Sequence, residues 1–375
     1  MHYLIVVMLL LYALLLWAFL RAWKKLPSEK KQTKGDISLI SVIVPFRNEA
    51  KHLPQVWKRL QAQDNTGPVE LIFVDDHSED GGLEIIRKET ENEVSIAVNI
   101  TQLNKDERGK KAALQKGVAI SSGDFLLFTD ADVFHPPSWI RTMREALTES
   151  TQTHLCWGGI RIIGKERQII FLQQLEYGIL MLSGASSLAL GFPLLSTGAN
   201  LILRKPSLEA LGKDPWHQEL ASGDDVFLVE KIWKQFGRES IRFVKSREAL
   251  CETPGLMRWG DVYKQRLRWA GKSAKTNLKA RLTGLAVVLA NLAFLLSIGL
   301  LGFGKTGVAV PIICLLLKAI PEWMLAVAWT GWSGQRKALR AFPRMVFLYP
   351  VFLIFLWMGT LGGGASWKGR KIRVR

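Results

Sequence analysis

Residues 125–134 are Phe-Leu-Leu-Phe-Thr-Asp-Ala-Asp-Val-Phe. The first four are apolar, as in a buried β-strand, and two carboxylates, Asp130 and Asp132, follow with one small residue between them. Two carboxylates at this spacing can hold a hard divalent cation, Mg²⁺ or Mn²⁺, which bridges diphosphate oxygens and neutralises a leaving group. An isolated Asp-x-Asp is usually a solvated acidic turn. The position after an apolar strand favours a metal site here.

Strand and helix patterns alternate on the N-terminal side of this segment. Apolar runs predict strands over 37–44, 69–74, 94–100 and 125–128. Helical patterns lie between them, through residues 53–60, up to about residue 88, and over 110–120. Near-continuous apolar strands that alternate with helices indicate an α/β fold with a mostly parallel sheet. No Gly-x-Gly-x-x-Gly follows the first strand, which argues against a dinucleotide-binding Rossmann enzyme.

Polar residues follow these strands, where the ligands of such sheets bind. Pro45-Phe-Arg-Asn-Glu49 comes after the first strand and Asp75-Asp76 after the second. One of these aspartates is suited to accept a hydrogen bond from a nucleobase or ribose, although helix capping by Asp76 or Ser78 is the alternative. Lys110 begins a helix and is placed to approach a phosphate, or else belongs to a solvated first turn.

Asp224 and Asp225 open another apolar helical pattern. Capping of the helix N-terminus explains one aspartate, and Asp224 is better placed for it. Asp225 is then left in the first turn without a structural need. It is a candidate general base for an acceptor hydroxyl, which requires a carboxylate within hydrogen-bond reach.

A basic and aromatic segment, residues 265–269, precedes the C-terminal apolar runs. Arg266 and Arg268 could clamp a diphosphate, and Trp269 could stack on a sugar or a base. A basic and aromatic belt beside a membrane is the alternative, and position alone favours neither.

Both ends of the chain predict membrane helices. Residues 3–20 form an almost unbroken apolar run followed by Arg21, Lys24 and Lys25, which predicts an uncleaved anchor over residues 1–23 with the next domain in the cytoplasm. Runs over 282–303, 308–329 and 345–361 predict a C-terminal membrane region over 282–365.

A basic tail follows over residues 366–375. Four crossings would put this tail outside, against the positive-inside rule, so the last apolar run is a candidate re-entrant segment. Lys318 and Glu322 share a helix face within the second run, where a structural pair is favoured over a contact in an acceptor path.

The net charge is +17, from 50 Lys and Arg against 33 Asp and Glu. This balance suits a phosphate-rich partner, whether a nucleotide, an anionic lipid or a nucleic acid. Nucleic acid is the weakest of the three, because much of the charge flanks apolar segments. We expect a membrane and a nucleotide as partners, and no nucleic acid.

In this order the motifs resemble the family 2 glycosyltransferases with the GT-A fold, over about residues 41–269. In that family the residues matching Pro45, Arg47, Asn48 and Glu49, and the aspartate matching Asp75 or Asp76, bind the nucleoside of the donor. Asp130 and Asp132 match the metal-binding DxD. Gly198-Ala199-Asn200 resembles the acceptor-side GAN loop. Asp225 matches the proposed general base of the ED motif, with Asp224 in place of its glutamate on the acceptor side. Gln265, Arg268 and Trp269 match QxxRW, and Arg266 fills an open position. Gln265 and Trp269 are expected to contact the acceptor, and Arg266 and Arg268 the donor.

The resemblance implies a GT-A catalytic domain over 37–270 that transfers a sugar, with inversion, from a UDP- or GDP-sugar. It implies a multi-pass enzyme of the cytoplasmic membrane whose catalytic domain faces the cytoplasm. The likeness extends to ceramide glucosyltransferase-like enzymes and to cellulose, chitin and hyaluronan synthases. The apolar stretch 171–195 predicts an interfacial helix near the acceptor path, which favours a lipid or a membrane-channelled glycan as acceptor. A processive polysaccharide synthase is the first alternative, and a non-catalytic membrane scaffold is a more distant one.

Overall fold

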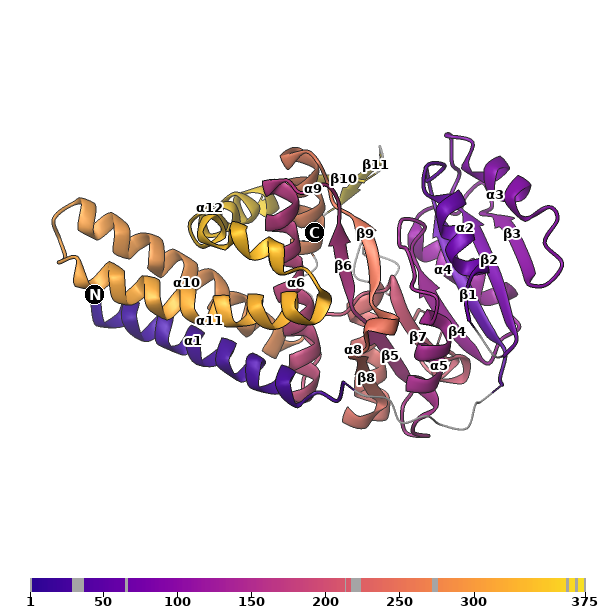
Figure 1. Ribbon diagram of the computed structural model, residues 1–375, viewed down its shortest axis with the longest axis horizontal. Helices are drawn as coiled ribbons and strands as arrows, with labels where there is room; N and C mark the ends of the chain where they lie inside the picture. The colour runs from indigo at the N-terminus through magenta and orange to yellow at the C-terminus, as the bar shows by residue number, and fades with distance from the viewer. Residues whose placement is uncertain are drawn as a thin grey trace. The chain divides into compact units, whose positions relative to one another are not determined.

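The computed structural model describes residues 2–28, 37–64, 67–212, 214–216, 224–271, 276–361, 364–367 and 370–373. For Asp224 and from residue 361 onward only the backbone is described. The chain divides into two compact units (Figure 1). The helical unit contains residues 1–26, 164–195 and 255–375, and the sheet unit contains residues 27–163 and 196–254. Each unit is described separately below.

The sheet unit is built on a seven-stranded sheet with the strand order β3-β2-β1-β4-β7-β5-β8 (Figure 1). The first four strands along the chain pair in parallel: β1 (Ile40–Phe46), β2 (Val69–Asp75), β3 (Ala97–Gln102) and β4 (Phe125–Thr129). β7 (Asn200–Arg204) runs antiparallel to both β4 and β5 (Leu155–Gly158), while β8 (Ile241–Val244) is parallel to β5. A separate two-stranded sheet joins β6 (Ile160–Ile163) and β9 (Cys251–Pro254). The predicted α/β fold with a mostly parallel sheet is confirmed.

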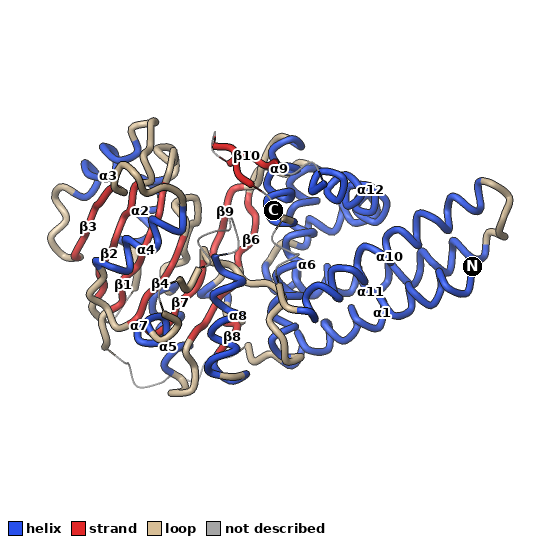
Figure 2. Tube along the Cα trace, turned by 180° about the vertical axis from the view of Figure 1, so that it is seen from behind, coloured by secondary structure: helices blue, strands red, loops and turns tan. Residues whose placement is uncertain are grey.

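Helices connect these strands (Figure 2), and they are α2 (Leu53–Gln61), α3 (Gly82–Thr90), α4 (Lys110–Ile120), α5 (Trp139–Thr148), α7 (Lys205–Glu209) and α8 (Asp224–Phe236). The prediction for α4 matches both of its ends. Capping of α3 by Asp76 or Ser78 is wrong, because α3 begins only at Gly82, whose N–H donates to Asp80 Oδ1 at 3.1 Å.

Burial explains where the strand predictions succeed. Every residue of β1 and of β4 is buried, so both sequences are continuously apolar. β3 lies at the edge of the sheet and alternates between exposed and partly exposed residues. Val94, predicted as its first residue, is 96% exposed, and the strand begins at Ala97.

The helical unit contains α1 (His2–Lys25), α6 (Gln168–Ala189), α9 (Trp259–Ala270), α10 (Leu278–Gly302), α11 (Ala309–Ser333) and α12 (Phe342–Leu361), with a short hairpin of β10 (Gly364–Trp367) and β11 (Arg370–Arg373). Among the described residues, four segments are long and apolar enough to cross a membrane: His2–Lys25, Leu278–Gly302, Ala309–Ser333 and Arg336–Thr360. The last apolar run, our candidate for a re-entrant segment, forms one unbroken helix, α12. Gly362 and Gly363 beyond it lie outside the described residues.

Two segments of the predicted catalytic domain belong to the helical unit. Residues 164–195 and 255–270 lie there, and the predicted catalytic domain over 37–270 stays a prediction. α6 ends at Ala189, and much of its length is buried among the helices of its own unit. At Gly178 an added Cβ would lie 2.1 Å from the Trp329 ring, so α6 and α11 approach each other too closely for any side chain there.

Lys318 and Glu322 form the predicted pair inside the helical unit. The Lys318 ammonium lies 2.6 and 2.7 Å from the two Glu322 oxygens, and both residues are buried. The Tyr12 hydroxyl of α1 donates to the same carboxylate at 2.9 Å. Because a charge buried among apolar helices has to be paired, these contacts support the structural interpretation of the pair.

Candidate active site

The acidic motif forms a tight turn at the end of β4. The Val133 N–H donates to the Asp130 carbonyl at 3.1 Å, so Asp130 to Val133 make one turn. Ala131 is only 2% exposed, whereas Asp130 and Asp132 are partly exposed. Two backbone hydrogen bonds, of 2.8 and 2.9 Å, then tie Phe134 to Glu252 of β9. The small residue between the aspartates is therefore needed for packing, and the turn is held on both sides.

Lys110 contacts this acidic turn directly. It is the first residue of α4, after Gly109 with a φ of +94°. Its ammonium lies 2.6 Å from Asp130 Oδ1, and the two side chains are 25% and 34% exposed. The predicted phosphate-binding lysine and the predicted metal ligand thus form an ion pair with each other in the structure.

The segment after β1 braces the loop after β2. Arg47 donates to the carbonyls of Asp76 and His77 at 2.7 and 2.8 Å and is only 6% exposed. Asn48 has a φ of +52°, and its side-chain oxygen accepts from the Glu79 N–H at 2.9 Å. These contacts hold two neighbouring strand ends in register, and the predicted donor-binding roles of Arg47 and Asn48 stay predictions.

Other residues of this predicted donor segment are placed as follows. Pro45 lies within β1 beside Val74 of β2, and Glu49 accepts a hydrogen bond from His52 Nδ1 at 2.7 Å. Asp75 is fully buried and accepts from the Ser78 N–H at 3.0 Å and from Gln102 Nε2 at 2.7 Å. Its carboxylate thus shapes the loop. The neighbouring Asp76 is only 2% exposed as well, and the predicted contact of either aspartate with the donor stays a prediction.

A buried polar network lies behind the acidic turn. Thr129 Oγ1 and His135 Nε2 share a hydrogen bond of 2.6 Å, and the His135 ring stacks on Trp139 at 4.0 Å. Trp139 Nε1 donates to Asn200 Oδ1 at 2.8 Å. All four residues are at most 1% exposed. The network connects the strand that carries the metal motif to the start of β7, and the sequence gives no sign of it beyond the histidine that closely follows the motif.

Asn200 is the centre of this network. Its Nδ2 donates to the carbonyls of Gly159 and Ala249 at 2.9 and 2.8 Å, while its Oδ1 accepts from Trp139. An added Cβ at Gly158 would lie 2.5 Å from this amide, so the backbone at Gly158 lies very close to it. The polar groups of a buried amide have to be paired, and these contacts pair them within the sheet unit. The predicted acceptor roles of Gly198, Ala199 and Asn200 stay predictions.

Replacing Asn200 with alanine is expected to destabilise the sheet unit by about 3 kcal/mol, because it leaves the Trp139 N–H and two carbonyls buried without partners. The melting temperature of the purified chain should fall by roughly 6 °C or more. Asn99→Ala removes the same amide from an exposed position on β3 and serves as the matched control. An equal small shift in both variants would contradict the structural role of Asn200.

Burial lowers the pKa of His135 to about 3, with the charge of Arg59 adding to the effect. The unfolded chain takes up a proton on His135 near pH 6.5, and the folded chain does not. The contribution of the neutral imidazole to the unfolding free energy is therefore complete above pH 6.5 and is lost as the pH drops toward 3. The slope is about 1.4 kcal/mol per pH unit. We expect His135→Gln to be less stable at pH 7.5 but to lose less stability between pH 7 and pH 5 than the wild type. Melting curves across this range check it, and parallel pH profiles would contradict it.

Asp225 lies in the first turn of α8, and its Oδ1 accepts from the next backbone N–H, that of Val226, at 2.8 Å. Trp216, upstream of this helix, packs edge-on against Phe128 of β4 at 6.3 Å. α8 begins at Asp224 as predicted, but the Asp224 side chain lies outside the described residues, so its capping and acceptor roles stay predictions.

In the helical unit, α9 carries the residues that match QxxRW. Arg266 Nε lies 2.9 Å from both oxygens of Glu176 on α6, its guanidinium covers the Trp269 ring at 4.3 Å, and it is 3% exposed. Gln265 Oε1 accepts from Arg266 as well. In the structure Arg266 is held by a carboxylate of its own unit, whose side chain is 13% exposed, and its predicted donor-clamping role stays a prediction. The roles of Gln265, Arg268 and Trp269 stay predictions.

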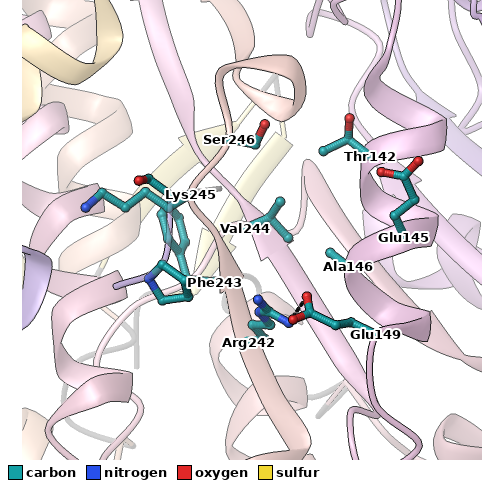
Figure 3. A pocket seen from close by; sticks show the side chains of 11 residues that line it. Thr142, Glu145, Ala146, Glu149, Arg242, Phe243, Val244, Lys245 and Ser246 are labelled. Carbon is teal, nitrogen blue, oxygen red and sulfur yellow. Dashed lines mark hydrogen bonds and ion pairs between the residues drawn. The ribbon is translucent and has the colours of Figure 1, made fainter. Parts of the chain in front are cut away.

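A pocket between α5 and β8 is shown in Figure 3. Glu149, the residue after α5, pairs with Arg242, while the Lys245 side chain points away from Glu145 and Glu149. Burial lowers the pKa of Lys245. None of the residues predicted for the donor, the acceptor or the metal lines this pocket.

The acidic turn offers an incomplete set of metal ligands. In the part of the chain that the structure describes, no group of three or more His, Cys, Asp or Glu side chains is gathered. Asp130 and Asp132 supply carboxylate oxygens, the donors that Mg²⁺ prefers, and Mg²⁺ usually takes its remaining ligands from water and substrate phosphates. Two partly exposed carboxylates therefore fit a cation that is shared with a diphosphate.

Comparisons with known proteins agree with this architecture. Residues 41–209 match the family Glycosyl transferase family 2. An undecaprenyl-phosphate 4-deoxy-4-formamido-L-arabinose transferase from Aeromonas hydrophila is 36% identical over 30% of this chain and 34% of the relative. A dolichol-phosphate mannosyltransferase from Saccharomyces cerevisiae is 34% identical over 30% of this chain and 42% of its own length. The chain thus spans less than half the length of these relatives.

Among solved structures, the mannosyltransferase PcManGT from Pyrobaculum calidifontis, in complex with GDP-Man and Mn²⁺, superposes with a TM-score of 0.60. The match covers 92% of this chain and 99% of that protein at 19% identity. The sheet and the acidic turn at its carboxyl edge define a GT-A fold. Residues 41–209 form a domain of Glycosyl transferase family 2, as the sequence motifs predict.

Proposed function

We propose that this protein is an inverting glycosyltransferase that moves one sugar from a UDP- or GDP-sugar to a hydroxyl-bearing lipid in the membrane. The observation that carries the proposal is the turn from Asp130 to Val133, which presents two carboxylates at the carboxyl edge of a GT-A sheet. The family match and the GDP-Man and Mn²⁺ in the PcManGT complex support a nucleotide-sugar donor.

Asp130 and Asp132 would hold a divalent cation, Mg²⁺ or Mn²⁺. When bound, this ion neutralises the charge that develops on the departing diphosphate. The chain's own contribution is to fix both carboxylates: β4 and the Phe134–Glu252 bridge hold the two ends of the turn, and the His135 network fills the space behind it. Fixed groups do not have to reorganise during reaction, which is the main advantage of such a site.

Asp225 is the proposed general base. An acceptor hydroxyl attacks the anomeric carbon from the side opposite the diphosphate, the bond to the diphosphate breaks, and the hydroxyl proton passes to the Asp225 carboxylate. A hydroxyl is a weak nucleophile near neutral pH and needs such a base. This requirement is why we favour a hydroxyl-bearing acceptor.

A membrane acceptor is supported by the four apolar helices. Arg336, Lys337 and Arg340 lie between α11 and α12, Arg344 lies in the first turn of α12, and Lys24 and Lys25 end α1. Both clusters suit the cytoplasmic side of a membrane, and we propose that the sheet unit faces the cytoplasm.

A polyprenyl phosphate is the second candidate acceptor, because the names of two relatives specify undecaprenyl phosphate and dolichol phosphate. A phosphate monoester is already largely ionised at neutral pH and would need Asp225 much less. The two acceptors therefore make different demands on the same residue.

The proposal is tested with the full chain in lipid vesicles, supplied with Mn²⁺ and a panel of UDP- and GDP-sugars. Membrane lipid extracts and a polyprenyl phosphate are offered separately, and the products are weighed by mass spectrometry. We expect a lipid that has gained one sugar. A ladder of sugars would identify a processive synthase instead, and no transfer from any donor, despite nucleotide binding, would support a non-catalytic scaffold.

A further inference from the structure

The ion pair between Lys110 and Asp130 places a positive charge on the predicted metal ligand. The ammonium lies 2.6 Å from Asp130 Oδ1. Lys110 belongs to α4 and Asp130 to the turn after β4, so two separate elements of the sheet unit meet at this contact. Neither side chain is deeply buried, and both can move without disturbing the core.

A divalent cation and the Lys110 ammonium compete for the same carboxylate. A metal ion binds carboxylate oxygens at about 2.0 to 2.6 Å, which would bring two positive charges within a few ångströms of each other. Such like charges repel, and a partly exposed site screens this repulsion only in part. The cation alone therefore binds Asp130 at the expense of the lysine contact.

A donor diphosphate removes this conflict, because it gives Lys110 a new anionic partner. Lys110 is the first residue of α4. The backbone N–H groups at the start of this helix and the lysine ammonium therefore belong to the same short segment, and both kinds of group attract a phosphate. Once Lys110 has moved to a phosphate oxygen, Asp130 is free for the metal ion.

We propose that Lys110 is an internal counterion that blocks metal loading until a nucleoside diphosphate group arrives. This inference rests on the proposed function and adds a coupling between the two ligands. In the resting site Lys110 neutralises Asp130, and in the loaded site it neutralises the diphosphate. The lysine thus makes binding of the metal and of the nucleotide mutually dependent, and the coupling acts equally in both directions.

The coupling predicts effects of opposite sign for Lys110→Met. Without nucleotide, the variant should bind Mn²⁺ roughly three- to tenfold more tightly than the wild type, the range expected for losing a partly exposed ion pair. Without metal, it should bind UDP or GDP several-fold more weakly. The factor by which the nucleotide improves Mn²⁺ affinity should therefore shrink.

The experiment titrates Mn²⁺ into the purified full chain in detergent, with and without UDP or GDP, and follows free Mn²⁺ by electron paramagnetic resonance. Lys116→Met is the matched control, since it removes the same charge from a later turn of α4. Lys110→Arg keeps the charge and should bind Mn²⁺ as weakly as the wild type. Melting curves confirm that each variant is folded.

The outcomes separate this inference from the proposed function. Tighter Mn²⁺ binding in Lys110→Met, but not in Lys116→Met, supports it. Unchanged or weaker Mn²⁺ affinity in Lys110→Met, in a chain that still binds nucleotide with Mn²⁺, overturns the counterion role alone. If the wild type binds neither Mn²⁺ nor nucleotide under any condition, the proposed function fails and the counterion role fails with it.

Discussion

Replacing Asp225 with asparagine is expected to slow sugar transfer to a hydroxyl acceptor by a factor on the order of 10³ or more, while the nucleotide-sugar still binds. Asparagine has nearly the same shape as aspartate but cannot accept the proton. Asp225 Oδ1 accepts from the Val226 N–H, and because the amide oxygen of asparagine can accept the same hydrogen bond, this contact should survive the substitution. Turnover is measured with saturating donor and acceptor, and donor affinity by calorimetry.

Asp261→Asn is the matched control for Asp225, since Asp261 lies in the first turn of α9 as Asp225 does in that of α8, and it is exposed. We expect this control to retain wild-type turnover. Normal turnover of Asp225→Asn with every hydroxyl-bearing lipid would show that Asp225 is not the general base. Transfer that survives only with a polyprenyl phosphate would identify the second acceptor as the natural one.

The second large effect is expected for Asp132→Ala, which removes one of two carboxylates from the acidic turn. The affinity for Mn²⁺ in the presence of UDP or GDP should fall on the order of 100-fold or more, because loss of even a supporting group around a metal costs up to that factor. Binding of the nucleotide should then no longer respond to Mn²⁺. Isothermal titration with and without Mn²⁺ measures both quantities.

Asp124→Ala provides the comparison for Asp132, because Asp124 is an exposed aspartate just before the other end of β4. It should bind nucleotide and Mn²⁺ as the wild type does. If Asp132→Ala retained the wild-type difference between nucleotide affinity with and without Mn²⁺, the acidic turn would not be the metal site.

The parts of the fold that were predictable are those with a strong local cause. β1 and β4 are buried throughout, so their sequences are apolar without interruption. α4 begins directly after Gly109, which has a positive φ, and the sequence shows this boundary. The edge strand β3 is only partly buried. The exposed residue Val94, just before it, is of a type common in strands, although the strand begins only at Ala97.

The contacts that could not be predicted join distant segments. Nothing near Asn200 in the sequence indicates that its amide is surrounded by Trp139, Gly159 and Ala249. In the same way, nothing near Arg266 indicates that it pairs with Glu176, on a helix ninety residues earlier. The division into two units has the same cause, because α6 and α9 pack with helices from both ends of the chain. The motifs predict the chemistry of the site, and the structure adds the contacts that hold its residues.

Metal-dependent sugar transfer at the acidic turn is tested most directly in lipid vesicles. The vesicles contain the purified wild-type chain, a membrane lipid extract and an isotopically labelled nucleotide-sugar. With Mn²⁺ we expect a labelled lipid heavier by one sugar, and no labelled lipid once the metal is chelated or Asp132 is replaced by alanine. Equal labelling of the lipid in all three conditions would contradict a metal-dependent transfer at the turn formed by Asp130 and Asp132.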